Sequence, residues 1–272
     1  ILLMQLEIPV PTELKAARIA HEAGAFVVIN PAPYAELPEE IFKYISLFIP
    51  NETELASFSG MPVTDKESAA AAAKVLFGKG QVAQLRGQIP SDARILVTYG
   101  GGSVVRSGLL DQIRSELAGL TLFEFGGIEP NPTYETLMGA VELARAEKVD
   151  FLLAVGGGSV LDGSKFIAAA AHYDPARDPW HILETVGGEV ASAIPLGSVL
   201  TLPATGSEMN MGAVITRKST GDKQHFFSPF VMPRFAVLDP VLTYTLPARQ
   251  VANGVVDAFI HTLEQYLTYP VN

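Results

Sequence analysis

The sequence predicts an α/β fold built on a parallel sheet with helices on both faces. Short apolar runs of strand length alternate with helix-like segments along the chain, and two of these runs end in Gly-Gly-Gly-Ser. Hydrophobic residues make up 48% of the chain and charged residues 18%, which is a globular composition rather than a disordered one. With 272 residues, the chain is long enough for roughly two domains.

The N-terminal part begins with a helix that we expect from Thr12 to Ala23, because Gly24 provides a typical helix end. Apolar runs at Phe26–Ile29 and Ile45–Ile49 predict two strands. The alanine-rich segment Ser68–Leu76 predicts a second helix, since alanine is the residue that costs least to fix in a helix. Helix patterning then ends at the turn Phe77-Gly78-Lys79-Gly80.

The rest of the chain repeats the alternation of strand and helix. Pro132 is expected near the start of one helix, where its missing N–H costs nothing. Apolar runs predict five strands and helical spacing predicts three helices: strands at Arg94–Tyr99, Leu122–Phe125, Asp150–Val155, Ser198–Leu202 and Phe235–Leu238, and helices at Gly108–Leu117, Pro132–Ala146 and Val251–Thr268.

Charge and cysteine content restrict the partners and the chemistry. The formal net charge is −10, so the chain repels phosphate backbones and anionic lipid, and neither nucleic acid nor a membrane surface is expected as a partner. No apolar run approaches the roughly 20 residues of a membrane span, and the first residues do not resemble a signal peptide. The absence of cysteine excludes disulfides and thiolate metal sites and fits a cytoplasmic protein. Because the chain begins at Ile1, we expect a fragment.

The second Gly-Gly-Gly-Ser turn is a candidate phosphate site. It runs from Gly156 to Ser159 directly after a predicted strand and opens a predicted helix. Glycine allows close approach of the backbone, and a helix N-terminus offers free N–H groups, so a pyrophosphate is expected on the amides of Gly157, Gly158 and Ser159. The alternative is a tight turn of the kind that many α/β folds contain. Asp162 and Lys165 follow as weaker candidates, either near the cofactor or as a dipole-facing carboxylate and a solvated lysine.

The first Gly-Gly-Gly-Ser turn indicates which dinucleotide binds. NAD enzymes usually place an acidic residue where the adenosine ribose lies, but this turn offers Gly101, Gly102 and Ser103, with Arg106 one turn later. Small residues and a cation leave room for a 2′-phosphate. The sequence therefore predicts NADP(H) rather than NAD(H), with an ordinary turn and a solvated arginine as the alternative.

Several motifs fall in one order after Phe77. They are Phe77-Gly78-Lys79-Gly80, the two glycine turns, Gly126-Gly127-Ile128-Glu129-Pro130-Asn131-Pro132, Thr201-Leu202-Pro203-Ala204-Thr205-Gly206-Ser207-Glu208, Leu238-Asp239-Pro240, Leu246-Pro247 and Asp257-Ala258-Phe259-Ile260-His261. This order resembles the iron-containing, group III alcohol dehydrogenases, and it is most similar to their NADPH-dependent aldehyde reductase branch. The resemblance covers Phe77 to Asn272. It implies a Rossmann-like cofactor domain and the start of an all-helical domain.

The resemblance also implies residue roles. Thr201 and Thr205 match positions that line the nicotinamide and its ribose, and Lys223 matches a lysine that reaches the cofactor ribose. Asp257 and His261 match the first two of four metal ligands. Residues four apart lie on one helix face, so this carboxylate and imidazole can meet one ion, with Fe²⁺ and Zn²⁺ both suitable. By spacing alone, such a pair is more often a surface hydrogen bond.

Two departures from the family pattern affect the expected activity. The family takes two further histidine ligands from a later helical domain, and His21, His172, His181 and His225 match none of those positions. Two ligands rarely hold a catalytic ion, so we expect the cofactor half to fold without supporting the reaction alone. The family also enters the Phe-Gly-Lys-Gly turn from a strand, whereas the predicted helix at Ser68–Leu76 leads into it here.

The first seventy-six residues resemble a different family, the ribokinase branch of sugar kinases. The resemblance rests on Asn30-Pro31-Ala32-Pro33 and Pro50-Asn51-Glu52-Thr53-Glu54, and it implies that Asn51 and Glu54 descend from residues that position magnesium and phosphate. The alternative is that these polar residues cap a helix. The family's later glycine turn and catalytic aspartate have no counterpart here, so kinase activity is not expected.

We therefore expect a ribokinase-like fragment at 1–76, a dinucleotide-binding domain at 77–247 and the first helix of a truncated metal-binding domain at 248–272. The main functional prediction is hydride transfer between NADP(H) and a small aldehyde or alcohol with a divalent metal. The resemblance also suggests a homodimer, since members of the family often dimerise. Three alternatives stay open: a nucleotide-binding fragment without activity, a carbohydrate phosphotransferase, and a lyase of the dehydroquinate synthase type. The Asp257/His261 pair and the Thr-Gly-Ser-Glu stretch favour the dehydrogenase over the lyase.

Overall fold

The computed structural model describes residues 2–6, 8–25, 27–30, 35–38, 40–41, 44, 47–48 and 74–268. The chain divides into two units, Ile1–Ala72 and Ala73–Asn272. The boundary lies a few residues before the join that we expected at Leu76. Residues 51–73, which include Asn51 and Glu54 of the kinase-like stretch, lie outside the described part.

The first unit contains a small parallel sheet of strands β1 (Leu2–Gln5), β2 (Val27–Asn30) and β3 (Leu47–Phe48), in that order. Helix α1 (Val10–Glu22) begins two residues before the predicted start, and Gly24 follows it with φ of +72°, as a helix end of this kind requires. The buried core of the unit is formed by Met4, Leu6, Ala17, Val27, Ile29 and Ile41. The α/β character predicted for this segment is confirmed.

The second unit is built on a six-stranded parallel sheet with the strand order β4-β11-β8-β7-β5-β6. The strands are β4 (Lys74–Phe77), β5 (Arg94–Tyr99), β6 (Thr121–Phe125), β7 (Phe151–Gly157), β8 (Leu196–Leu202) and β11 (Phe235–Leu238). All five pairings in this sheet are parallel. The carboxyl ends of all six strands therefore lie along one edge of the sheet, where ligands of open α/β sheets bind.

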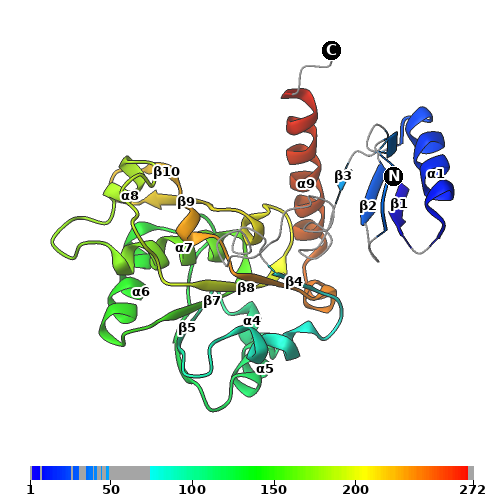
Figure 1. Cartoon of the computed structure of the whole chain (residues 1–272). Coiled ribbons are helices and arrows are strands. Elements are labelled where there is room, and N and C mark those ends of the chain that lie inside the picture. The colour runs from blue at the N-terminus through cyan, green and yellow to red at the C-terminus, as the bar shows by residue number, and fades with distance from the viewer. Residues whose placement is uncertain are drawn as a thin grey trace. The chain divides into compact units, whose positions relative to one another are not determined.

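Helices cover both faces of this sheet, as Figure 1 shows. Along β7, Leu152 and Ala154 contribute to one core, whereas Leu153 and Val155 contribute to another, because successive side chains of a strand point to opposite faces. The first core is covered by α6 and α7, and the second by α4, α5 and the 3₁₀ segment η2. These elements are α4 (Ser103–Arg106), α5 (Leu109–Glu116), α6 (Tyr134–Ala146), α7 (Gly158–His172), α8 (His181–Glu184) and η2 (Gln81–Gln88).

The segment that enters the Phe-Gly-Lys-Gly turn corrects one prediction. A helix was expected over Ser68–Leu76, but Lys74–Phe77 form strand β4, which pairs in parallel with β11 through Leu76 and Val237. The helix prediction is therefore wrong for the last three residues of its range. Helix propensity is a weak preference, and it is overridden here by backbone pairing with β11 at the edge of the sheet. The unit consequently enters the turn from a strand, and this supposed departure from the family pattern disappears.

A two-stranded antiparallel hairpin was not predicted. It consists of β9 (Gly212–Arg217) and β10 (Asp222–Phe227), joined by a turn at Gly221, which has φ of +77°. The hairpin contributes three buried residues to the same core as α7: Ala213, Ile215 and Phe226. The hairpin therefore extends that core and reaches toward the carboxyl edge of the large sheet.

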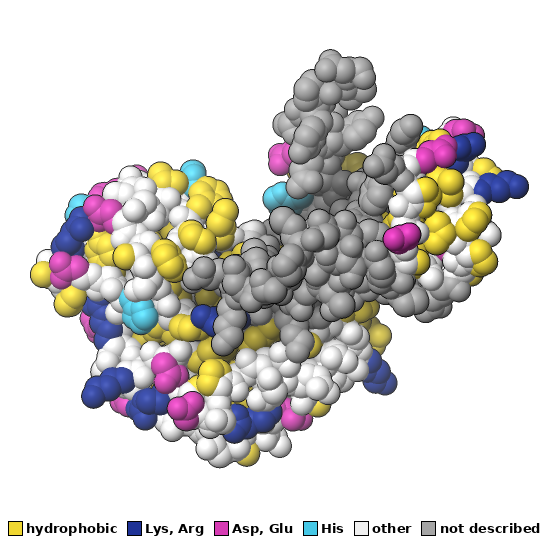
Figure 2. All heavy atoms as spheres, in the orientation of Figure 1, with side chains coloured by type: hydrophobic (Ala, Val, Ile, Leu, Met, Phe, Trp, Pro, Cys, Tyr) yellow, Lys and Arg dark blue, Asp and Glu magenta, His cyan; other side chains and the backbone are white. Residues whose placement is uncertain are grey.

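Helix α9 (Ala248–Thr268) ends the described part of the chain and begins three residues before the predicted start. Several of its apolar side chains are largely exposed, among them Val255, Val256 and Phe259. In the described residues, no helix is long and apolar enough to cross a membrane. On the face of the molecule that Figure 2 shows, lysine and arginine side chains alternate with acidic ones instead of forming a basic patch.

Candidate functional site

The glycine turn after β7 has the geometry of a phosphate-binding helix N-terminus. Strand β7 continues through Gly156 and Gly157, two residues beyond the prediction, and α7 begins at Gly158. Gly157 is the N-cap, so the N–H groups of the following residues have no partner within the helix. A Cβ atom on Gly158 would lie 2.5 Å from Thr205 Oγ1, and one on Gly156 would lie 2.6 Å from a methyl group of Val160. Glycine is therefore required here by close packing.

The earlier glycine turn lies at the carboxyl end of β5, next to β7 in the sheet. Gly102 has φ of +91° and precedes α4, and its N–H donates to the carbonyl of Gly100 at 2.9 Å. A Cβ atom on Gly102 would lie 3.5 Å from an Nη atom of Arg106, so the guanidinium group folds back over the turn. Gly101 and Ser103 are exposed on either side. Arg106, the cation that was expected to leave room for a 2′-phosphate, thus lies directly beside the small residues of the turn.

Lys223 reaches the second glycine turn through Asn131. Its Nζ donates to Asn131 Oδ1 at 2.8 Å, and the backbone N–H of Asn131 donates to Ser159 Oγ at 3.3 Å. Asn131 has φ of +57°, a left-handed conformation that asparagine tolerates better than most residues. The structure therefore brings together three segments that are far apart in the sequence, and the exposed Lys223 of strand β10 lies beside the glycine turn after β7.

Glu129 stabilises the loop that carries Asn131. It accepts hydrogen bonds from Thr133 at 2.6 Å, Thr136 at 3.0 Å and Lys218 Nζ at 2.9 Å. Burial acts to raise the pKa of Glu129, but the hydrogen bonds from Thr133, Lys218 and Thr136 outweigh it and lower the pKa to about 2. Glu129 is consequently ionised at neutral pH and fixes the loop that carries Asn131.

Thr201 and Thr205 lie on either side of the carboxyl end of β8. Thr201 is a residue of β8 itself and is half-buried, whereas Thr205 is exposed in the loop that follows. Thr205 Oγ1 accepts a hydrogen bond from the Ser207 N–H at 3.3 Å, and the Thr205 side chain packs against Gly158. Thr201 thus lies one strand away from the glycine turn after β7, whereas Thr205 packs directly against that turn.

Lys165 is fully buried, which corrects its interpretation as a solvated side chain. Its Nζ donates to Ser207 Oγ at 2.9 Å, Asn210 Oδ1 at 2.8 Å and the Gly212 carbonyl at 2.8 Å. Asp162, one helical turn earlier, accepts from Ser207 Oγ at 2.6 Å and from the Val214 N–H at 3.0 Å. Helix α7 therefore holds Ser207 and Asn210 of the loop between β8 and β9, together with the start of β9. We call this set of hydrogen bonds the α7 clamp.

Burial shifts the pKa values within the α7 clamp. Desolvation lowers the pKa of Lys165 to about 8, although the nearby carboxylates of Asp162 and Glu208 act in the opposite direction. Desolvation also raises the pKa of Asp162, against the hydrogen bonds from Ser207 and Val214. Both carboxylate oxygens of Asp162 accept hydrogen bonds from the protein itself. These bonds support a role for Asp162 in holding the loop after β8, in addition to its predicted place near the cofactor.

Asp257 and His261 lie on one face of α9, as their spacing predicts. Asp257 Oδ2 and His261 Nε2 are 3.7 Å apart, and both side chains are about half exposed. A carboxylate and an imidazole so close together suit a borderline divalent ion. Within the described residues, no third histidine or acidic side chain joins them in a group that could hold a metal ion. The two side chains therefore fit the expected ligand types but form half of a usual set.

Helix α9 is held close to the loop after β8. A Cβ atom on Gly254 would lie 3.0 Å from the Pro203 carbonyl, so glycine allows a tight approach. An open cavity of about 430 Å³ separates other parts of the loop and helix, and Gly206, Glu208 and Ala258 are among its lining residues. Helix α9, which carries Asp257 and His261, and the loop that carries Thr205 thus line the same cavity.

The comparison with known families decides the assignment. The family of iron-containing alcohol dehydrogenases matches residues 72–240. The chain belongs to the iron-containing alcohol dehydrogenase family. Residues 3–85 match a second family, the pfkB family of carbohydrate kinases, in agreement with the sugar-kinase resemblance of the first unit.

Relatives within the iron-containing alcohol dehydrogenases are similar to the second unit. The NADPH-dependent aldehyde reductase YqhD of Escherichia coli (strain K12) is 70% identical over 199 residues, which cover 73% of this chain and 51% of that protein. A probable NADH-dependent butanol dehydrogenase of Bacillus subtilis (strain 168) is 46% identical over 73% of this chain and 51% of its own length. The chain therefore spans about half the length of these relatives.

Solved structures of the family give the same result. A crystal structure of Escherichia coli YqhD superimposes with a TM-score of 0.72 at 70% identity, covering 73% of this chain and 51% of that one. The NADH-dependent butanol dehydrogenase A of Thermotoga maritima superimposes with a TM-score of 0.67 at 38% identity, covering 71% and 48%. The predicted α/β fold with a mostly parallel sheet is thereby confirmed.

Glu208 is a candidate functional residue to which no role was assigned from sequence. It lies in the 3₁₀ segment η3 (Ser207–Met209), and its Oε2 atom is buried without a hydrogen-bond partner among the described residues. Its place in the Thr-Gly-Ser-Glu stretch was the available signal, but that stretch does not reveal which oxygen is buried or what faces it.

Proposed function

We propose that the second unit is the dinucleotide-binding part of an NADP(H)-dependent oxidoreductase that acts on a small aldehyde or alcohol. The observation that carries the proposal is the turn between β7 and α7, where helix N–H groups, Ser159 and the Asn131–Lys223 pair converge at the carboxyl edge of the sheet. A cationic side chain and free N–H groups are what a pyrophosphate needs. The similarity to an NADPH-dependent aldehyde reductase supports the same assignment.

The order of strands suggests how the cofactor lies. Arg106 and the first glycine turn are at the end of β5, the phosphate turn is at the end of β7, and Thr201 and Thr205 are at the end of β8. Adjacent strands are about 4.8 Å apart. We infer that an extended NADP(H) crosses these ends in order, with its 2′-phosphate near Arg106 and its nicotinamide near Thr201 and Thr205.

We further propose that Asp257 and His261 are two ligands of a divalent metal ion, iron or zinc. When bound, NADPH supplies hydride and the metal ion polarises a carbonyl oxygen. This chain's own residues bind and orient: the glycine turns and Lys223 hold the dinucleotide, and the α7 clamp fixes the loop that carries Thr205. A homodimeric assembly and a cytoplasmic location are further proposals, which molar mass in solution and cell fractionation test.

The cofactor proposal is tested by titrating NADPH into the chain and following the fluorescence of the nicotinamide. We expect saturable binding that Lys223→Gln weakens about tenfold, because the substitution removes a charge beside the pyrophosphate. Lys148→Gln is the matched control, since Lys148 is an exposed lysine just before β7, at the amino edge of the sheet. Equal weakening by both substitutions, or no binding by the unchanged chain, would contradict the proposal.

The metal proposal is tested separately by calorimetric titration of Zn²⁺. We expect one weak site per chain whose affinity falls about tenfold or more in His261→Ala, because that imidazole is one of two ligands. His225→Ala is the control, because His225 is exposed on β10 and has no carboxylate at this spacing. If His225→Ala lowers the affinity as much as His261→Ala does, the metal does not bind at α9.

A further inference from the structure

Two methionines lie at the surface of the loop after β8, residues 203–211. Met209 ends the segment η3 and Met211 directly precedes β9, and the two residues are 39% and 46% exposed. The other methionines in the described residues are buried or half-buried: Met4, Met138 and Met232. Met209 and Met211 are therefore the methionines of the described chain that are most open to a dissolved reagent.

The backbone around these two methionines carries the contacts that hold the loop to α7. Lys165 Nζ donates to Ser207 Oγ at 2.9 Å, to Asn210 Oδ1 at 2.8 Å and to the Gly212 carbonyl at 2.8 Å. Asn210 Oδ1 also accepts from the Gly212 N–H at 3.0 Å. Each acceptor of Lys165 thus lies one or two positions from one of the methionines, and Asn210 lies between them.

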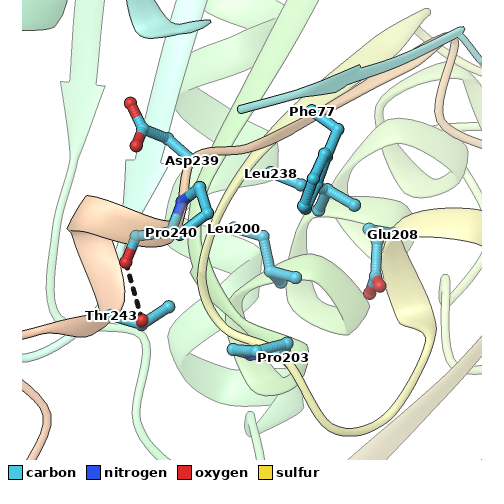
Figure 3. A pocket seen from close by; sticks show the side chains of 8 residues that line it. All are labelled: Phe77, Leu200, Pro203, Glu208, Leu238, Asp239, Pro240 and Thr243. Atoms are coloured by element: carbon cyan, nitrogen blue, oxygen red, sulfur yellow. Dashed lines mark hydrogen bonds between the residues drawn. The ribbon is translucent and has the colours of Figure 1, made fainter. Parts of the chain in front are cut away.

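The same loop forms part of the walls of two cavities. Pro203 and Glu208 line the cavity beside α9, and they also line a smaller cavity of about 210 Å³ that Leu200 and Leu238 border as well. Figure 3 shows Pro203 and Glu208 on the loop at this smaller cavity. Because Glu208 directly precedes Met209, a displacement of the loop at the methionines changes the walls of both cavities.

Oxidation converts a methionine from an apolar residue into a polar one. A hydroperoxide transfers one oxygen atom to the thioether: the O–O bond breaks, an S=O bond forms, the sulfur loses two electrons, and hydrogen peroxide leaves as water. A thioether sulfur is a weak hydrogen-bond acceptor, whereas the sulfoxide group is polar. All three donors of Lys165 are used by the loop and the start of β9, so a sulfoxide oxygen beside them competes for the same protons.

We propose that Met209 and Met211 are a peroxide-sensitive modification site, and that their oxidation to sulfoxides loosens the loop after β8 from the α7 clamp. The proposal depends only on the loop and α7, and it goes beyond the proposed function. One consequence rests on the proposed function: Thr205 belongs to the same loop, so oxidation also weakens NADPH binding. Methionine sulfoxide reductases restore the thioether, which makes the modification reversible.

The site is tested by treating the full chain with graded concentrations of hydrogen peroxide and measuring each methionine by peptide mass spectrometry. We expect Met209 and Met211 to be oxidised at least about fivefold faster than the half-buried Met138 and Met232, because exposure controls access of the peroxide. Similar rates at all four positions would overturn the site. This comparison uses the unchanged chain and needs no variant.

The loosening of the loop is tested by hydrogen–deuterium exchange of the same samples. We expect amides of residues 204–212 to exchange about threefold faster after oxidation and to return to the original rate after treatment with methionine sulfoxide reductases. The double variant Met209→Leu/Met211→Leu has no sulfur in the loop and should not respond to peroxide. The matched control Met138→Leu/Met232→Leu should respond as the unchanged chain does.

Two results would overturn the loosening. They are unchanged exchange at 204–212 after complete oxidation of both methionines, and an equal response of the double variant in the loop and of the unchanged chain. NADPH titrations keep this test separate from the proposed function. NADPH binding by the untreated chain tests the proposed function, whereas the difference in exchange between oxidised and untreated samples requires no cofactor.

Discussion

At the scale of single residues, Arg106 is the side chain that we propose determines the choice of cofactor. Its guanidinium group lies over Gly102 in a turn that contains no acidic side chain. An acidic residue in this place would favour the free ribose hydroxyl of NAD(H). We therefore expect the chain to bind NADPH more tightly than NADH, and Arg106→Gln to lower the NADPH affinity about tenfold while changing the NADH affinity by less than about twofold.

Fluorescence titrations of both cofactors check this prediction. Lys148→Gln again serves as the control, because it removes one positive charge at the amino edge of the sheet and should leave the ratio of the two affinities unchanged. Equal affinity of the unchanged chain for NADPH and NADH would show that the arginine does not read the 2′-phosphate.

Residue roles that depend on local pattern were open to prediction, whereas those that depend on distant partners were not. The glycine turn after β7 could be predicted as a candidate phosphate site, because a strand, a tight turn and a helix follow one another directly in the sequence. Lys165 resembles any helical lysine in the sequence, because its three partners lie more than forty positions away. The contact between Lys223 and Asn131 likewise spans 92 positions. The roles given to Thr201, Thr205, Asp257 and His261 stay predictions.

At the scale of elements, α7 connects the phosphate turn to the loop after β8 through the α7 clamp. The pKa of Lys165 is about 8 in the folded chain, and an unfolded lysine titrates near 10.5. Between these values the unfolded chain binds more protons than the folded one. The penalty for burying a charged lysine is thus present below about pH 8 and fades as the pH rises, so the clamp stabilises the fold more strongly at high pH.

Urea unfolding followed by the fluorescence of Trp180 measures this effect, since Trp180 is the sole tryptophan and is buried in the second unit. We expect the difference in unfolding free energy between the unchanged chain and Lys165→Met to grow by about 2 kcal/mol from about pH 7.5 to about pH 9.5. Lys148→Met is the exposed control and should show no such growth. A difference that is constant with pH would mean that Lys165 titrates normally.

The strands and helices of the second unit were largely predictable, because long apolar runs bounded by glycine and proline leave few alternatives. β4 was missed because its neighbours are rich in alanine and its pairing with β11 is a tertiary effect. The hairpin was missed because Val214, between the buried Ala213 and Ile215, is apolar and 37% exposed. An apolar residue at this exposed position hides, in the sequence, the alternation of apolar and polar residues by which a half-buried strand is recognised.

At the scale of the whole chain, two families meet at one strand. The sugar-kinase match ends at residue 85 and the dehydrogenase match begins at 72, so both include β4 and the turn after it. A short parallel edge strand makes few demands beyond apolar side chains and backbone pairing, which explains why either pattern accommodates it. We expect β4 to belong energetically to the second unit, because it pairs with β11.

The location of the cofactor is the central claim, and hydrogen–deuterium exchange of the full chain with and without NADPH tests it most directly. The account predicts slower exchange, in the presence of NADPH, of the amides at 100–106, 157–162 and 201–207, which are the ends of β5, β7 and β8 and the turns that follow them. Amides of α1 in the first unit should exchange at the same rate in both samples. Protection confined to the first unit, or no protection at 157–162, would contradict the account.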